Sequence, residues 1–304
     1  MQGQSQKIAF VTDKATVPEY DNIKTENGKL VAFLKEKGFF PSCQVWDDQK
    51  VNWADFDAVI VKTPWDYHKR IVEFQAWLCK LEKVGAYVLN PVDVMRWNSD
   101  KIYLREMEEK GVRIAPTLWL GQGDKFDVER IFAELKTDKI IVKPRVSASA
   151  NHTYALTKEE AVAKKENIER LLRDHCFMAQ PFLKEVQTKG EWSLLFFGGK
   201  FSHSILKTPK ESDFRVQGHF GGTVHKLEAP VHLVDTAQRI VDLFGKSCLY
   251  VRVDGLEVED EFVLMEFEAI EPYFFLLKSD NGVELFYEAL VSCLEGKSAL
   301  GKEN

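Results

Sequence analysis

Short apolar runs alternate with amphipathic segments through about the first 95 residues, and no other feature limits the range of folds as strongly. The amphipathic segments, 28–39 and 71–85, space their apolar residues as one face of a helix. Each contains a glycine, Gly38 or Gly85, at which a helix would end. Strands that alternate with helices predict a parallel, doubly wound sheet in this part of the chain. The four strand-like runs lie within residues 7–13, 41–47, 56–67 and 86–91.

The segment TPWDY, residues 63–67, ends the third of these runs. Ligands on parallel sheets bind beyond the carboxyl ends of the strands. Trp65, Asp66 and Tyr67 are therefore candidates for the substrate side of a site. A turn with one packed tryptophan explains the same residues equally well.

Composition excludes several classes of protein. The chain has 304 residues, 45% hydrophobic and 29% charged, which is the balance of a globular protein with room for more than one domain. No apolar run approaches the roughly 18 residues that span a bilayer, and the first residues lack the pattern of a signal peptide. The five cysteines are scattered, which disfavours disulfides and zinc sites, and the net charge of -6 disfavours a nucleic-acid partner. We expect a cytoplasmic protein that binds neither membrane nor nucleic acid.

The pattern changes after the first 95 residues. The segment NSDKIYLREMEEKG, residues 98–111, starts with capping residues and ends at a glycine, which predicts one helix with Lys101 in its first turn. The last third of the chain predicts antiparallel sheet instead of parallel sheet. Two alternating strands within 190–209 turn at Gly198-Gly199, and residues 249–272 form a second hairpin.

In the second hairpin, the strand VLMEFEAIEP places glutamates among large apolar residues. If residues 259–261 form a three-residue turn, Asp254 faces Glu266 and Arg252 faces Glu268. Alternation then puts all four side chains on one face of the sheet. A two-residue turn would break this pairing.

Carboxylates that face each other across a sheet repel unless a cation lies between them. Arg252 can neutralise one acid, which leaves two more. An oxygen-rich cluster without His or Cys suits a hard ion such as Mg2+, whose shell nucleotide phosphates and water complete. Asp254, Glu266 and Glu268 are therefore candidate magnesium ligands. A solvated sheet face, with its acids kept apart by water, is the alternative.

Phosphates on such a metal require further positive charge. Lys143 ends the apolar strand IIVKP, where burial of a cation is costly unless an anion binds it. The small-residue loop that follows contains Ser147 and Ser149, and its backbone N–H groups could converge on an oxyanion. Lys207 and Arg215 flank a polar, glycine-containing segment and are further candidate anion contacts. Taken singly, each of these residues is more often a solvated surface group.

In this order, the motifs resemble the ATP-grasp superfamily. The matching features are the lysine of NSDK, the strand lysine of IIVKPRVSASA, the strand MAQPFL, a glycine-bearing loop and the acids of the closing hairpin. The resemblance covers nearly the whole chain. Residues 191–217 and the ending EFEAIEP look more narrowly like the branch that contains the cyclo-ligase of cycloserine biosynthesis.

The resemblance implies an α/β and α+β architecture in which two α+β subdomains enclose a nucleotide cleft. The N-terminal doubly wound domain would span residues 1–95. The small subdomain would span 96–183, and the C-terminal subdomain with the metal site 184–304.

The resemblance also implies roles for single residues. Asp254, Glu266 and Glu268 would bind one or two Mg2+ ions, for which Mn2+ could substitute, and Glu268 stands where the family commonly has asparagine. Arg215 would contact the acyl phosphate or a substrate carboxylate, with Lys207 as a second catalytic cation. The residues implied for ATP are Lys101, Lys143, Ser147, Ser149, Gln180, Phe182, Leu183, Glu185 and Glu191, the last two as alternatives for the ribose.

The activity implied is an ATP- and Mg2+-dependent carboxylate–amine ligase. ATP would convert a carboxylate to an acyl phosphate, and an amine of the same or a second molecule would displace phosphate. The GHFGG segment and the SASA loop are candidate lids that keep water from the acyl phosphate. The expected partners are a small-molecule carboxylate and an amine, and a homodimer is compatible with the resemblance. Two alternatives stay open: a nucleotide-binding protein without turnover, and a phosphotransferase with His203, His219 or His225 as acceptor.

Overall fold

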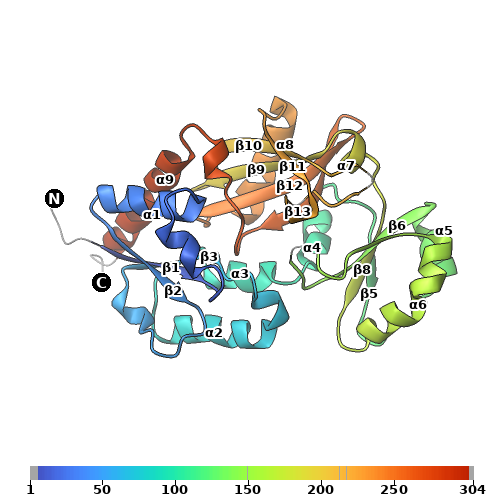
Figure 1. Ribbon diagram of the computed structural model, residues 1–304, viewed down its shortest axis with the longest axis horizontal. Coiled ribbons are helices and arrows are strands. Elements are labelled where there is room, and N and C mark those ends of the chain that lie inside the picture. The colour runs from blue at the N-terminus through green and yellow to red at the C-terminus, as the bar shows by residue number, and fades with distance from the viewer. Residues whose placement is uncertain (1–5, 149, 212, 217, 301–304) are drawn as a thin grey trace.

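The computed structural model describes residues 6–300 except 149, 212 and 217, and three β-sheets dominate this part of the chain (Figure 1). The N-terminal sheet has the order β2-β1-β3-β4, and all of its strand pairs are parallel. This confirms the parallel, doubly wound sheet predicted from the alternation of strands and helices. Its elements are β1 (Lys7–Thr12), α1 (Glu26–Glu36), β2 (Phe40–Val45), β3 (Ala58–Thr63), α2 (Ile71–Lys83) and β4 (Val88–Leu89).

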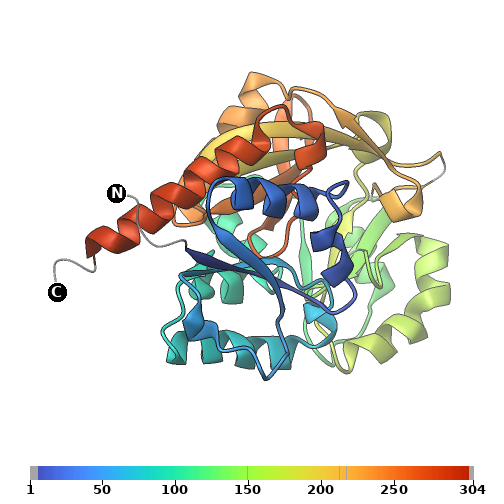
Figure 2. The same cartoon turned by 60° about the vertical axis from the view of Figure 1, so that its left-hand side comes forward.

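Both faces of the N-terminal sheet are covered by helices. Ile8 and Phe10 of β1 pack in a core shared with α1 and with α9 (Gly282–Leu300), the last helix of the chain. The alternate residues Ala9 and Val11 pack in a second core with α2. Figure 2 shows α9 beside α1, so the two ends of the chain build one layer.

A second sheet, antiparallel with the order β5-β8-β6-β7, lies at the right of Figure 1. Its core is closed by α5 and α6, whose apolar residues pack with those of the strands. Helix α6 begins with a capping box formed by Thr157 and Glu160. The elements are β5 (Leu118–Leu120), α5 (Val128–Leu135), β6 (Lys139–Pro144), β7 (Tyr154–Thr157), α6 (Lys158–Leu172) and β8 (Phe177–Pro181).

The third sheet is antiparallel with the order β11-β10-β9-β12-β13. As predicted, β9 and β10 turn at Gly198 and Gly199, both at positive φ, which a tight two-residue hairpin turn requires. The elements are α7 (Glu185–Thr188), β9 (Glu191–Phe197), β10 (Lys200–Thr208), β11 (Thr223–Lys226), α8 (Val231–Phe244), β12 (Tyr250–Val258) and β13 (Glu261–Glu268). Short 3-10 turns occur at Val17–Asp21, Trp53–Asp55, Tyr67–Lys69, Gly218–Phe220 and Leu276–Lys278.

The single helix predicted over 98–111 is wrong. The chain forms α3 (Val92–Asn98), then a turn, then α4 (Tyr103–Glu109). Asn98 does not cap a helix, because its side chain bonds the backbone of Phe267 and Ala269 on the third sheet. Lys101 therefore lies in the turn before α4 instead of in the first turn of a helix, and its backbone N–H donates to Arg145.

One face of β9 is apolar at one end of the strand and polar at the other, and the polar end forms part of the site. Leu195 and Phe197 pack in the core beneath α9, whereas Glu191 and Ser193, on the same face, lie at the open end of the strand and bond charged side chains. The opposite face carries Leu194 and Phe196, which pack against α8. The third sheet is thus covered on one face along its length, and on the other face only at one end.

The domain boundaries stay a proposal. Each of the three sheets falls within one of the ranges 1–95, 96–183 and 184–304, but the hydrophobic cores cross between them. Within the described residues, none of the helices combines the length and the apolar character needed to cross a bilayer.

Candidate active site

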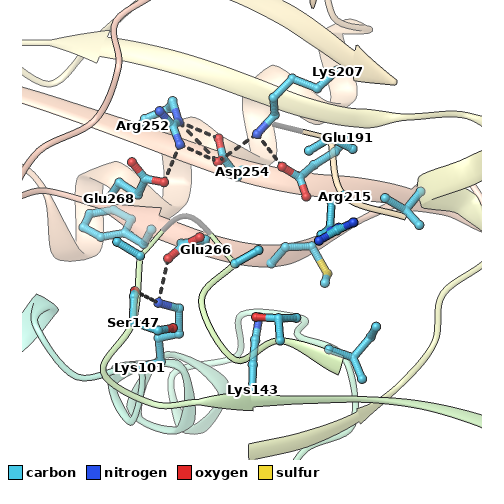
Figure 3. Close-up of a pocket in the computed structure, with 18 of the residues that line it drawn as sticks. Lys101, Lys143, Ser147, Glu191, Lys207, Arg215, Arg252, Asp254, Glu266 and Glu268 are labelled. Carbon is cyan, nitrogen blue, oxygen red and sulfur yellow. Dashed lines mark hydrogen bonds and ion pairs between the residues drawn. The ribbon is translucent and has the colours of Figure 1, made fainter. Parts of the chain in front are cut away.

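A cavity of about 620 Å³ opens between the second and third sheets and reaches the N-terminal sheet. Strands β9, β10, β12 and β13 supply its charged floor (Figure 3). The walls come from β6 and β8 and from the turn before α4. Two later stretches complete them with Phe214, Arg215, Val216 and Gly218, and with Glu271, Tyr273 and Phe275. Trp65 and Tyr67, beyond β3, also line it, as predicted for the carboxyl end of a parallel strand. Asp66 does not, and accepts a hydrogen bond from the Trp46 indole instead.

The second hairpin has the predicted pairs but not the predicted turn. Asp254 faces Glu266 and Arg252 faces Glu268. The turn, however, has two residues, Glu259 and Asp260, both at positive φ. A β-bulge between Asp254 and Gly255 restores the register that such a turn would have broken.

The bulge has a recognisable cause. Met265 is the extra residue of β13, since Gly255 pairs with Leu264 and Asp254 pairs with Glu266. The Phe262 ring lies where a side chain at Gly255 would be, 2.2 Å from an added Cβ, so only glycine fits there. A glycine inside a strand pattern is a known mark of a bulge, and this signal was present in the sequence.

The three candidate metal ligands come together. One carboxylate oxygen each of Asp254, Glu266 and Glu268 lies within 4.8 Å of the other two. In an octahedral magnesium site, opposite ligands lie about 4.2 Å apart and adjacent ligands about 3.0 Å apart. The three oxygens, each within 4.8 Å of the other two, could bind one hard cation if their side chains moved closer together.

Arg252 and Lys207 neutralise this acidic cluster from one side (Figure 3). Arg252 bonds Asp254 at 2.9 Å and also bonds Glu268. Lys207 bonds Asp254 at 3.1 Å and also Glu191. Asp254, 2% exposed, further accepts a hydrogen bond of 2.6 Å from Ser193. Burial opposes its charged form, but Arg252 and Lys207 outweigh burial and lower the pKa of Asp254 to about 2.

Lys101 neutralises the cluster from the opposite wall. Its Nζ lies 2.9 Å from Glu266 and 2.9 Å from the backbone oxygen of Ser147 (Figure 3). Burial penalises the charge of Glu266, but Lys101 and Lys143 outweigh it and lower the pKa of Glu266. Burial and the neighbouring carboxylates raise the pKa of Glu268 despite Arg252. The floor therefore contains acids of unequal strength.

Lys143 differs from the other cations of the cavity. It points into the cavity from β6 in Figure 3, and within the described part of the chain no hydrogen bond or ion pair engages its Nζ. Burial lowers its pKa, and Lys101 nearby acts in the same direction. A half-buried lysine without an anion is costly, so the position is suited to a negatively charged ligand.

The strand β8 and the residues after it form the apolar end of the cavity. Gln180, Phe182 and Leu183, all proposed to contact the nucleotide, line it together with Ile141 and Val186. Gln180 is buried, and its Nε2 donates to Thr117 at 2.9 Å. Its Oε1 is buried without a partner in the described residues, so an acceptor is available for a ligand donor.

Of the two acids proposed for the ribose, only Glu191 lines the cavity, and Glu185 is not among the residues that surround it. Glu191 begins β9 and is paired with Lys207. Burial raises its pKa. The geometry favours Glu191 because α7 places Glu185 outside the cavity.

Of the two candidate lids, the SASA loop contributes Ser147, Ala148 and Ala150 to the lining of the cavity, and the GHFGG segment contributes Gly218. Ser147 lines the cavity and donates to the backbone oxygen of Pro144, whereas Ser149 lies outside the described residues. Arg215 lines the cavity, pairs with Asp213 at 2.8 Å and stacks on Phe220 at 3.7 Å. Arg215 thus faces the floor but is bound to its own segment.

Sequence reasoning missed one charged residue of the cavity and understated another. Arg252 was expected to neutralise one acid, but it bridges two of the three candidate metal ligands. Glu271 lines the cavity beside Tyr273 and Phe275, and burial together with Glu266 raises its pKa to about 8. The acid-proline pair at the end of EFEAIEP was the available signal for Glu271.

Comparison with known proteins finds one matching family model and a similar protein that aligns with most of the chain. The family model for the N-terminal domain of D-cycloserine synthetase DcsG matches residues 8–90. Over 306 residues the chain is 26% identical to the cycloserine biosynthesis protein DcsG of Streptomyces lavendulae, with 95% of this chain and 99% of that protein covered.

Solved structures agree with these matches. The crystal structure of D-cycloserine synthetase DcsG superposes with a TM-score of 0.81 at 26% identity, covering 95% of this chain and 99% of that one. D-alanine–D-alanine ligase from Bacillus anthracis, complexed with ATP, gives 0.70 at 16% identity, covering 98% and 99%. The ATP-grasp ligase PsnB, complexed with a minimal precursor, gives 0.65 at 17% identity, covering 95% and 99%. These likenesses confirm the predicted architecture and the resemblance.

Proposed function

We propose that this chain, which has the ATP-grasp fold, is an ATP-dependent ligase that joins a small-molecule carboxylate to an amine. The observation that carries the proposal is the cavity floor. Three carboxylates suited to one hard cation lie between two sets of positive side chains, and an unpaired lysine faces them from β6. The similarity to DcsG over the whole chain supports ligase activity in particular.

The nucleotide would lie between β8 and the floor. Phe182 and Leu183 offer apolar contact and backbone groups to the base, and the free Oε1 of Gln180 could accept its amino group. Glu191 would bond the ribose. Lys101 and Lys143 would bind phosphate oxygens, because both cations face the acids whose metal the phosphates would share.

Asp254, Glu266 and Glu268 would hold magnesium. When bound, the ion neutralises charge on the phosphates during transfer. Arg252 would keep Asp254 and Glu268 oriented, and Lys207 would keep Asp254 oriented from the other side. Lys207 and Arg215 would stabilise the negative charge that develops as the phosphoryl group moves.

The reaction has two steps. The substrate carboxylate attacks the terminal phosphorus of ATP, and ADP leaves, so that an acyl phosphate forms. The amine then attacks the acyl carbon, phosphate leaves, and the amine nitrogen loses a proton. Since water would hydrolyse the acyl phosphate, the GHFGG segment and the loop at Ser147 would close over the cavity.

The structure offers no support for a histidine phosphotransferase among the residues described. His203 donates to the backbone oxygen of Phe274 and His225 bonds Thr208, and neither lines the cavity. Nothing is described of the side chain of His219.

The first test is the thermal unfolding midpoint with ATP, with and without Mg2+. A ligand at a hundred times its Kd stabilises a protein by about 2.7 kcal/mol, which is a readily measured shift. Glu266→Gln should abolish ADP release from acid and amine mixtures and leave the unliganded midpoint nearly unchanged. Glu82→Gln, an exposed acid paired with Arg96 far from the cavity, is the matched control.

Two results would reject the proposal. The absence of a Mg2+-dependent shift in the unfolding midpoint at millimolar ATP would mean that the three acids lie on a solvated sheet face and do not bind metal. A shift with no ADP release from any acid and amine pair would instead indicate a nucleotide-binding protein without turnover. Full ADP release by Glu266→Gln would remove the metal assignment alone.

A further inference from the structure

The acids of the cavity are matched by cations with one exception. Glu266 pairs with Lys101, Glu268 and Asp254 pair with Arg252, and Glu191 pairs with Lys207. Glu271 has no such partner in the part of the chain that is described. Lys101 and Arg252 act on it at longer range and are themselves engaged by other acids. An unmatched carboxylate in a cavity is suited to a positively charged ligand.

The surroundings of Glu271 are aromatic. Trp65, Tyr67, Tyr273 and Phe275 line the cavity together with Glu271. The Trp65 indole donates to the backbone oxygen of Glu271 at 3.3 Å, and the rings of Tyr273 and Phe275 meet edge-on with centroids 5.0 Å apart. The hydroxyl of Tyr67 also interacts with the Glu271 carboxylate.

These neighbours distinguish the position from the metal site. Glu271 does not belong to the group of three acids whose oxygens could bind one metal ion. A hydrated metal ion requires several oxygen ligands, and aromatic ring faces supply none. Ring faces do attract organic cations, and a carboxylate forms strong hydrogen bonds with an ammonium group.

The segment that carries Glu271 is fixed by a buried ion pair. Lys62 and Glu26, both fully buried on the N-terminal domain, bond each other at 2.8 Å. Lys62 also donates to the backbone oxygen of Pro272, and Glu26 accepts from the N–H groups of Phe274 and Leu276. The carboxylate is therefore presented on a preorganised backbone, as a selective binding residue requires.

We propose that Glu271, with the aromatic side chains around it, binds the ammonium group of an amine-bearing substrate. This deepens the proposed ligase function and rests on it. The ammonium group could belong to the amine that forms the new bond, or to an amino acid whose carboxylate is activated. Both sources share one chemistry, a primary alkylammonium, and the probes below separate them.

The test is calorimetric titration of the full-length protein saturated with MgADP, which prevents turnover. The probes are ethylammonium chloride, D-alanine, L-alanine and propionate. We expect at least one amine to bind and propionate to bind more weakly. Binding of ethylammonium indicates that the amine alone is recognised, whereas binding of an alanine without binding of ethylammonium indicates an amino acid. Either result supports the proposal if it depends on Glu271.

Glu271→Gln keeps the shape of the side chain and removes its charge. It should weaken amine binding by about 30-fold or more, the effect of removing one partner of a desolvated charge pair, and leave MgADP binding within about twofold. Tyr273→Leu, which keeps the charge but removes a ring face, should weaken it by about fivefold. Glu82→Gln is again the control.

Three results would overturn the proposal. The wild-type protein could bind MgADP but none of the three amines, or Glu271→Gln could bind the amine unchanged. The third is a loss of Mn2+ affinity in Glu271→Gln as large as in Glu266→Gln, which would make Glu271 a metal ligand. If MgADP itself does not bind, the ligase function fails instead, and the ethylammonium titration without nucleotide still tests Glu271.

Discussion

The charges on the floor of the cavity differ from those on its walls. On the floor, Asp254 bonds both Arg252 and Lys207. On the walls, neither Lys143 nor Glu271 forms an ion pair within the described residues, and burial shifts the pKa of each side chain in the direction that favours its neutral form. We infer that contacts within the protein hold the floor side chains in place. The wall side chains Lys143 and Glu271 would instead form their ion pairs with bound ligands.

The largest effect should follow from breaking the floor. Asp254→Asn removes the carboxylate shared by Arg252, Lys207 and Ser193 and leaves buried cations undercompensated. We expect unfolding free energy to fall by about 3 kcal/mol and ADP release to fall by about a hundredfold or more. Urea denaturation and an ADP-release assay measure the two effects. Normal stability in this variant would show that the floor contacts do not organise the fold.

A substitution of Lys143 on the cavity wall should weaken nucleotide binding without lowering the stability of the unliganded protein. Lys143→Met removes a desolvated charge that forms no ion pair within the described residues and interacts with Glu266 only at longer range. The unliganded protein should therefore be as stable as wild type or slightly more stable, while the thermal shift with MgATP disappears and ADP release falls about a hundredfold. If the unliganded variant is instead clearly destabilised, Lys143 has a structural partner and belongs with the floor.

A smaller effect is expected at Gln180, whose buried Oε1 has no partner in the described residues. Gln180→Leu should weaken ATP binding by about tenfold, because the pocket loses an acceptor for the base. Binding of inosine triphosphate, which lacks the amino group of adenine, should change little. Equal losses for both nucleotides in a competition assay would assign Gln180 to packing against Thr117 alone.

A last effect is the pH dependence of stability that Glu271 confers. A carboxyl whose pKa is higher in the folded protein stabilises the fold at low pH and loses this contribution as the pH rises through the folded pKa. Burial, together with Glu266, raises the pKa of Glu271 from its ordinary value of 4.5 to about 8. The unliganded protein should therefore lose stability between about pH 4.5 and pH 8, and Glu271→Gln should flatten part of this slope. Urea denaturation at several pH values measures the unfolding free energy of both proteins. Equal slopes of this free energy against pH for wild type and Glu271→Gln would contradict the prediction.

The sequence predicted the parallel sheet and the hairpin pairs for different physical reasons. The sheet follows from apolar runs long enough to be buried on both faces, which is a local signal. The pairs Asp254–Glu266 and Arg252–Glu268 were correct because two departures compensated, a turn shorter by one residue and a bulge at Met265. Asp254 also pairs with Ser193 across β12 and β9.

The missed features depend on contacts between distant parts of the chain. Residues 98–111 have the local signals of one helix, but Asn98 bonds the backbone of the third sheet, about 170 residues away, and the helix begins later. Glu271 carries no periodic signal, because its environment is formed by Trp65 and Tyr67 of another domain. Local patterns predict elements, whereas such tertiary contacts select which polar residues meet.

The buried pair of Lys62 and Glu26 has a consequence for how the protein is made. Glu26 is completed by the N–H groups of Phe274 and Leu276, and one face of the N-terminal sheet is covered by Val283, Phe286 and Leu290 of α9. During translation, the first strands therefore leave the ribosome long before the residues that cover them. A prematurely terminated product would expose the part of the sheet that α9 covers to chaperones and proteases.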